Sequence, residues 1–405
     1  MSESILPGRA PALAVIAAGA VLALALSGCS DEPTAANAPL VALPLTNLTV
    51  HDTTIVATGS STYRQNIPRN GTVNLVGRSG NYTAMALIQF SSTGFPARDT
   101  ALVFGAKLTL RFETWFGDSS GQFSFNMYRI SLPWGETTVT WDTVQAPGFY
   151  EQYTSRGSYS AGAGKDTQTV TIPLDTAMVR QWLATPTSTT NTRYGILLVP
   201  TGACSIIRGF HEYGYLTDSA SAGYYPTLQI IAGSPAGAPR DTASYAVSFD
   251  TWVGNIENLA TNPQLIYVQS GVDYRSTLSF DVSFIPRGAV INSANLLLTS
   301  DPATTRVTRF MTDSSFQLST NVSAIDRTIL DFYPVSGARR GGTILTYTVD
   351  MTRPVQLWTR EPNYGVTLRP NSSFDETSFE LLTFFNEKAP PSLRPRLKLK
   401  YSTVR

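Results

Sequence analysis

Short stretches of alternating apolar and polar residues recur along most of the chain. Clear examples are KLTLRF (107–112), FSFNM (123–127) and LRPRLKLK (393–400). A period of two is that of a β-strand with one face in the core and the other in water. The pattern predicts antiparallel sheets rather than long helices. We interpret the Arg and Lys row of the last stretch as a charged outer face that discourages edge pairing, in preference to a polyanion-binding stripe.

Two segments break this rule and carry a helical period instead. After Asp175, the apolar residues Met178, Val179, Trp182 and Leu183 fall on one helical face. Asp350 is followed in the same way by Met351, Val355 and Trp358. Aspartate is a favoured N-cap residue because its carboxylate accepts hydrogen bonds from free backbone N–H groups. Each segment is therefore predicted to be a short capped helix with its tryptophan in a core.

The chain also repeats itself, with the same landmarks in the same order in both halves. They are a strand ending at Phe90 or Phe280, a turn with Pro96 or Pro286, AKLTL (106–110) or ANLLL (294–298), the Asp-to-Trp helices, YGILLVP (194–200) or YGVTLRP (364–370), and PTLQI (226–230) or PRLKL (395–399). A Gly/Pro/Ser-rich stretch, typical of a linker, separates the two sets. We therefore expect an all-β protein with two tandem antiparallel β-sandwich modules, at 45–232 and 241–402, joined by a linker at 233–240.

The N-terminus is expected to be a targeting signal. Residues 11–26 form an apolar run that is too short for a typical transmembrane helix but suits a signal peptide. Leu26-Ser27-Gly28-Cys29 follows and resembles the bacterial lipobox, in which the cysteine is acylated and the chain is cut before it. This predicts a signal peptide at 1–28, lipidation of Cys29 and a flexible tether at 29–44. By analogy with lipoprotein sorting, the protein is expected at the outer membrane or cell surface.

Composition restricts the chemistry. The formal net charge is +1, which gives no electrostatic case for nucleic acid as a partner. The chain has only two histidines and two cysteines, which leaves little for nucleophile–base pairs or zinc sites. The usual catalytic and nucleotide-binding motifs do not occur in the sequence. We therefore expect a protein that is not an enzyme.

One motif suggests a family. Residues 134–141 read Trp134-Gly-Glu136-Thr-Thr-Val-Thr-Trp141, a W-x-E-x-x-V-T-W pattern. With the other landmarks of the first module, it resembles the DNRLRE domain family, whose jelly-roll modules are classed with carbohydrate-binding modules. The resemblance implies a jelly-roll-like sandwich in each module, although the second module lacks the motif. From the residues alone, the motif is interpreted as a structural corner in which Glu136 accepts backbone donors; sugar stacking by a tryptophan is the alternative.

Exposed aromatic residues in polar loops are the candidates for binding a glycan. We single out Trp115, Tyr150, Tyr153 and Tyr213, because sugars stack their C–H faces on aromatic rings. Jelly-roll modules often hold a structural calcium ion, and Asp118, Asp142 and Asp166 are candidate ligands that no spacing distinguishes. No other cofactor and no catalytic residue are expected.

The leading hypothesis is a lipid-anchored surface protein that binds glycan or polysaccharide without catalysis. A structural or adhesion protein that binds an envelope protein is the first alternative. A polysaccharide hydrolase or lyase is the weaker alternative, since paired carboxylates that meet only in space leave no sequence signature.

Overall fold

A computed structural model describes most of the chain after its first 47 residues. The described residues are 48–65, 73–91, 102–162, 167–184, 193–212, 224–233, 240–257, 259, 261–272, 274–306, 314–323, 329–337, 346–371 and 379–404. The predicted signal peptide, Cys29, the tether at 29–44 and most of the linker at 233–240 lie outside them. Within these ranges, no helix has the length and apolar character needed to cross a membrane.

The structure is all-β, with antiparallel sheets, as the alternating pattern predicts. We call the first group of strands the first sandwich. Its strands are β3 (Val73–Ser79), β4 (Tyr82–Phe90), β5 (Leu102–Gly117), β6 (Phe123–Arg129), β7 (Gly157–Ala161), β8 (Gln168–Pro173), β9 (Ile196–Pro200), β10 (Ile206–His211), β11 (Thr227–Gly233) and β12 (Asp241–Ile256). One layer runs β12-β11-β5-β8, and the other runs β10-β3-β4-β9-β6-β7. The long strands β5 and β12 take part in both layers, since β5 also pairs with β10 and β12 with β4.

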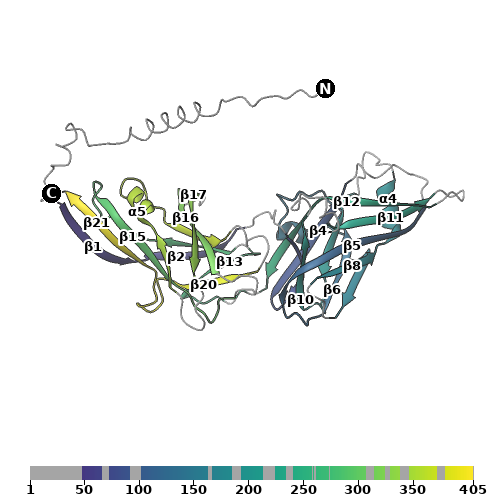
Figure 1. The fold of residues 1–405 in the computed structure, drawn as a ribbon, viewed down its shortest axis with the longest axis horizontal. Coiled ribbons are helices and arrows are strands. Elements are labelled where there is room, and N and C mark those ends of the chain that lie inside the picture. The colour runs from purple at the N-terminus through teal and green to yellow at the C-terminus, as the bar shows by residue number, and fades with distance from the viewer. Residues whose placement is uncertain are drawn as a thin grey trace, which may run out of the picture. The chain divides into compact units, whose positions relative to one another are not determined.

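The remaining strands form the second sandwich (Figure 1). They are β1 (Leu48–Val56), β2 (Gly59–Arg64), β13 (Leu265–Gln269), β14 (Tyr274–Ser279), β15 (Val290–Thr299), β16 (Ser314–Asn321), β17 (Ile329–Gly337), β18 (Thr346–Asp350), β19 (Val366–Pro370), β20 (Leu381–Phe385) and β21 (Arg396–Val404). One sheet has the order β1-β21-β15-β18. The other has the order β17-β16-β19-β14-β13-β20, with β2 paired to β14.

The two sandwiches have the same strand order once corresponding strands are matched. The order β12-β11-β5-β8 corresponds to β1-β21-β15-β18, and β7-β6-β9-β4-β3-β10 corresponds to β17-β16-β19-β14-β13-β20. The strand landmarks of the sequence repeat fall on these matched strands, with Phe280 directly after β14. Pro96 lies outside the described residues. The predicted internal duplication is therefore visible as a duplicated topology.

The Tyr-Gly landmark shows the match at single residues. Gly195 and Gly365 both have positive φ, +88° and +78°. A Cβ at Gly195 would lie 2.1 Å from the Ile88 carbonyl oxygen, and one at Gly365 would lie 2.4 Å from that of Leu278. Ile88 and Leu278 each lie two residues before the landmark phenylalanine. Each glycine therefore allows the same close approach of two backbones in its own sandwich.

One strand segment in each repeat pairs with the other half. The predicted boundaries group Leu48–Arg64 with the first module and Asp241–Ile256 with the second. In the structure β2 pairs with β14, with Ser61 opposite Thr277, while β12 pairs with β4 and β11. In Figure 1, purple β1 accordingly lies beside yellow β21, although the two strands are at opposite ends of the described chain. Each sandwich is thus completed by the leading strand segment of the other repeat.

This arrangement changes the interpretation of the last strand. β21 lies between β1 and β15 and is not an edge strand. Its exposed Lys400 ammonium lies 3.5 Å from the Asp52 carboxylate of β1. The expectation that its charged row discourages edge pairing is therefore wrong, because β1 occupies that edge.

The predicted helices are present. In α4 (Thr176–Leu183), the Asp175 carboxylate accepts a hydrogen bond from the Ala177 N–H at 2.9 Å, and Trp182 is buried. In α5 (Thr352–Trp358), the N-cap is Met351 rather than the predicted Asp350, whose carboxylate nevertheless accepts from the Thr352 N–H. The first sandwich has one more helix than predicted, α3 (Trp141–Gln145), which a Thr140–Thr143 capping box starts.

Each sandwich has its own main core, and the exchanged segments contribute to both. Trp252 of β12 packs in the first core and Ala57, between β1 and β2, in the second. Phe379 also joins the first core, where its ring lies 5.2 Å from that of Trp252. The two repeats are therefore interdependent in folding rather than simply placed in tandem.

Candidate functional site

The segment from Ser131 to Tyr150 carries the tryptophan motif and covers one face of the first sandwich. It contributes Val139, Val144 and Phe149 to a small additional cluster of the first sandwich, which also contains residues of β4, β9 and β12. Trp134 and Trp141 pack partly buried against this cluster. The motif therefore builds a cover over the sheet, which supports the structural-corner interpretation.

Trp134 connects this cover to two neighbouring segments. Its indole Nε1 donates a hydrogen bond to the Tyr194 carbonyl oxygen at 2.8 Å. Its ring meets that of Phe249 on β12 edge to face, with centroids 4.9 Å apart. In the second sandwich, Asn321 Nδ2 donates to the corresponding Tyr364 carbonyl. An asparagine therefore replaces the tryptophan of the motif in this role, which explains how the second module keeps its Tyr-Gly corner without the motif.

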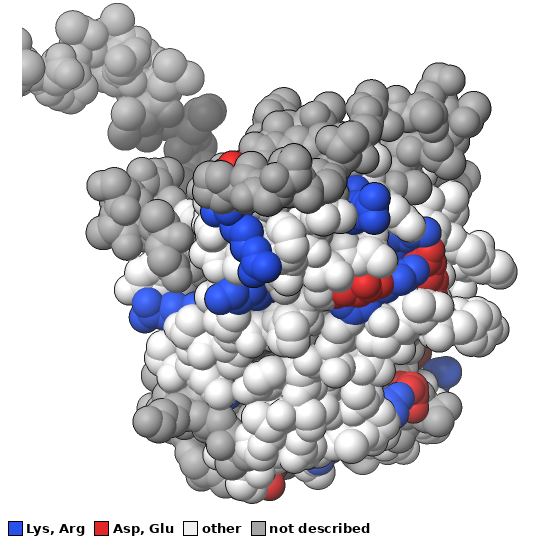
Figure 2. All heavy atoms as spheres, turned by 90° about the vertical axis from the view of Figure 1, so that its right-hand side faces the viewer, with Lys and Arg blue, Asp and Glu red and all other residues white. Residues whose placement is uncertain are grey.

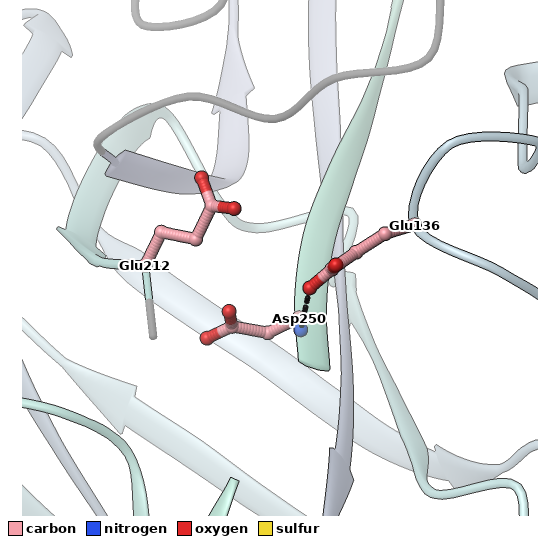
Figure 3. A group of neighbouring side chains, drawn as sticks. All are labelled: Glu136, Glu212 and Asp250. Atoms are coloured by element: carbon pink, nitrogen blue, oxygen red, sulfur yellow. Dashed lines mark hydrogen bonds between the residues drawn. The ribbon is translucent and has the colours of Figure 1, made fainter. Parts of the chain in front are cut away.

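Glu136 meets two further acids. Its Oε1 accepts a hydrogen bond from the Asp250 backbone N–H at 2.9 Å, so this backbone donor comes from β12 and not from the turn of the motif itself. The carboxylates of Glu136, Glu212 and Asp250 each place one oxygen within 4.8 Å of the others. Figure 3 shows the three side chains converging from three separate segments of the first sandwich. Glu212 and Asp250 are buried, so this is a carboxylate cluster largely shielded from water.

Burial is the main influence on the pKa of the Glu136 carboxyl group. Loss of hydration raises the pKa of its carboxyl group above the ordinary value, and the hydrogen bond from the Asp250 N–H opposes this only in part. Acids that lie this close also repel one another when all are ionised. The cluster is thus a place where a proton or a cation is favoured.

The cluster fits a hard divalent cation in ligand type. Ca²⁺ takes about six to eight oxygen ligands, many of them carboxylate oxygens. Glu136, Glu212 and Asp250 would hold the ion, which would offset their negative charge and fix the cover against β12. Two of the ligands expected from the sequence, Asp118 and Asp142, are not part of this cluster. Asp118 accepts from Ser120 in an exposed turn, Asp142 lies in the first turn of α3, and Asp166 is outside the described residues.

A tyrosine-bearing loop, residues 150–156, is the second feature of the site. Tyr150 is half-buried and packs on Tyr128, with ring centroids 5.4 Å apart. Tyr153 is 92% exposed. The loop therefore presents one aromatic ring almost entirely to solvent beside an anchored one.

Ion pairs fix both ends of this tyrosine loop. Arg156 lies 2.7 Å from a Glu151 carboxylate oxygen through Nη2 and 2.6 Å from an Asp175 oxygen through Nη1. Arg129 of β6 pairs with the other Glu151 oxygen and donates to Gln181 of α4. Burial alone would raise the pKa of Glu151 and of Asp175, but the hydrogen bonds they accept outweigh it and lower both pKa values. The loop is consequently tied to β6 and α4.

Arg156→Ala is expected to lower the free energy of unfolding by about 1–2 kcal/mol at neutral pH, because it breaks several charge-assisted hydrogen bonds. Since the folded-state pKa values of both acids are depressed, their stabilisation is present above the unfolded values near 4 and lost as pH falls through the lower folded values. In denaturant unfolding, the difference in the free energy of unfolding between the wild type and Arg156→Ala should therefore decrease below about pH 4. Arg180→Ala, at an exposed arginine of α4, serves as the control; an equal loss in that variant would contradict the account.

The other predicted aromatic residues are placed differently. Trp115 lies in β5, opposite Arg208 of β10, and packs partly buried on the first core rather than in the turn where the sequence places it. Tyr213 lies outside the described residues. Of the three candidates that the structure describes, Tyr150 and Tyr153 lie in one loop.

The sequence reasoning missed the carboxylate cluster and the ion-pair network. Glu136 was identified through its motif, but Glu212 and Asp250 are far from it in sequence. They meet it only because β10 ends and β12 passes next to the motif. The network left a weak signal, since Glu151 and Arg156 flank the exposed tyrosine.

Charge is mixed on the face that Figure 2 shows. Basic and acidic side chains lie side by side in the right half of this view, a few basic side chains lie together in its left half, and most of the described surface is uncharged. This distribution agrees with the low net charge of the chain.

Comparisons with known proteins assign no family. No protein-family model matches the chain, and no curated protein matches it. The resemblance to DNRLRE domains therefore rests on the motif residues and the landmarks alone.

Proposed function

We propose that the protein is a non-catalytic, lipid-anchored surface protein that binds glycan through the tyrosine loop. Tyr153 carries this proposal, because its ring is 92% exposed on a loop fixed by ion pairs. A loop that is held in one conformation loses little backbone entropy on binding, and tyrosine supplies a large contact area at a low cost in side-chain entropy. The resemblance to carbohydrate-binding modules and the lipobox at Cys29 support the same role.

The surroundings of Tyr153 suit a hydroxyl-rich ligand. Gln152, Thr154 and Ser155 are exposed beside it and offer uncharged donors and acceptors. An uncharged polysaccharide thus fits this surface better than a strongly charged polymer. The carboxylate cluster would act as a structural element, holding the motif cover against β12.

Tyr153→Ala is expected to weaken binding of glycan-array ligands at least about tenfold, the loss typical of an interfacial aromatic anchor. Tyr364→Ala, which removes a 39% exposed tyrosine of the second sandwich, should leave binding unchanged. Arg156→Ala should weaken binding less than Tyr153→Ala, because it loosens the loop without removing the ring. Retained binding in Tyr153→Ala, or an array with no ligand at all, would overturn the proposal.

A structural role in the envelope is the second candidate. The exchange of strand segments between the two sandwiches favours it, because strand pairing between chains is a common route to assembly.

A further inference from the structure

The exchanged segments are held unequally. β12 is anchored in the first sandwich by Trp252 in its main core and Val253 in its additional cluster, by the Glu136 hydrogen bond and by the Trp134–Phe249 contact. The segment that completes the second sandwich, Leu48–Arg64, places fewer apolar side chains in a core than β12 does. Ala57 is its one buried apolar residue, and Ile55 packs partly buried beside it.

The other described contacts of Leu48–Arg64 are mostly polar. The exception is His51, whose ring stacks on that of Tyr401 with centroids 4.7 Å apart. Arg64 donates to the Asn255 Oδ1 and to the Gly254 carbonyl of β12. Ser61 and Thr62 form hydroxyl pairs with Thr277 and Ser276, at 2.7 and 2.8 Å. The Thr58 N–H donates to the Ser279 carbonyl and the Ala57 N–H to that of Pro395. Such contacts specify register strongly but add little apolar stabilisation. A segment of this kind can leave its acceptor strands at lower cost than β12.

From this asymmetry we infer that Leu48–Arg64 is an exchangeable donor segment, which can complete the second sandwich of another copy of this chain. The acceptor edges are β14 and β21, the strands to which β2 and β1 add. When the Leu48–Arg64 segment of one copy pairs with β14 and β21 of a second copy, the segment of the second copy is released. It can then pair with the same strands of a third copy. Because donor and acceptor are different surfaces, the contact is heterologous and can propagate from copy to copy.

Whether Leu48–Arg64 pairs within its own chain or with another copy depends on the protein concentration. A donor joined to its own acceptor acts at an effective concentration of about millimolar, so dilute copies keep the segment in the same chain. Anchoring of many copies to one membrane, as proposed above, raises the concentration of neighbouring donors. The inference itself does not depend on glycan binding.

Cysteine cross-linking between separate copies tests this inference. The chain is produced from residue 30 onward with Cys204→Ala, which retains every described residue position and removes the native thiols. One preparation carries Ser61→Cys and a second, tagged preparation carries Thr277→Cys. We expect a disulfide-linked pair of chains whose yield rises with concentration, at least about tenfold above the control near millimolar protein.

The matched control uses two residues that face each other within the first sandwich. Thr109 of β5 and Thr171 of β8 lie opposite each other, with hydroxyl oxygens 3.4 Å apart. Copies with Thr109→Cys mixed with copies with Thr171→Cys report chance collisions between exposed thiols. A yield for the Ser61 and Thr277 pair no higher than this control at every concentration would overturn the inference, whether or not the protein binds glycan.

Discussion

Trp252→Ala is expected to lower the free energy of unfolding of the first sandwich by about 3–5 kcal/mol, the range for removal of a buried tryptophan. Trp252 is 1% exposed and lies on β12, which the sequence repeat assigns to the second half of the chain. Its neighbours are nevertheless those of the first core. Protection from hydrogen exchange should therefore fall in β4 and β11 and remain largely unchanged in β15 and β21.

Hydrogen exchange followed by peptide mass spectrometry separates these outcomes, because it reports protection for each strand. Ser244→Ala, at an exposed position of the same strand, should change stability by no more than about 0.5 kcal/mol. Loss of protection mainly in β15 and β21 of the Trp252→Ala variant would contradict the strand assignment.

Ala57→Asp tests the other exchanged segment in the same way and should destabilise the second sandwich. Ala57 is 4% exposed in the second core, although it lies near the start of the described chain. A carboxylate there must lose its hydration or remain protonated, which is expected to cost about 3–5 kcal/mol. Protection should fall in β14, β15 and β21 and persist in β4 and β11.

Val56→Asp provides a close control for this variant. Val56 is adjacent to Ala57 but 44% exposed, so a charge there stays hydrated and should cost less than about 1 kcal/mol. Equal losses in the two variants would mean that the segment is not inserted in a core.

The sequence predicted the architecture well because its main signals are local. Alternation identified strands such as β5 and β6, and Asp175 with its apolar face identified α4. The repeated landmarks predicted the matched strand order, since each marks a required local feature. Gly195 and Gly365, for example, both allow the same close backbone approach.

Pairing between distant segments could not be predicted in the same way. Local patterning predicts that a strand forms, but it does not distinguish pairing within a repeat from pairing across repeats. The boundary placed at the linker followed from composition, whereas sheet membership depends on which edge each strand reaches. The carboxylate cluster was missed for the same reason, because Asp250 reaches Glu136 only through the position of β12.

The reciprocal pairing of the leading strand segments is the central claim, and an intrachain disulfide tests it most directly. Ser61 of β2 lies opposite Thr277 of β14. The residue of the first sandwich that corresponds to Thr277 is Leu87 of β4, which lies opposite Thr251 of β12. At high dilution and with Cys204→Ala, Ser61→Cys combined with Thr277→Cys should oxidise rapidly within one chain, as peptide mapping would show. Ser61→Cys combined with Leu87→Cys should stay reduced; oxidation of this second pair instead of the first would show that each repeat keeps its own leading segment.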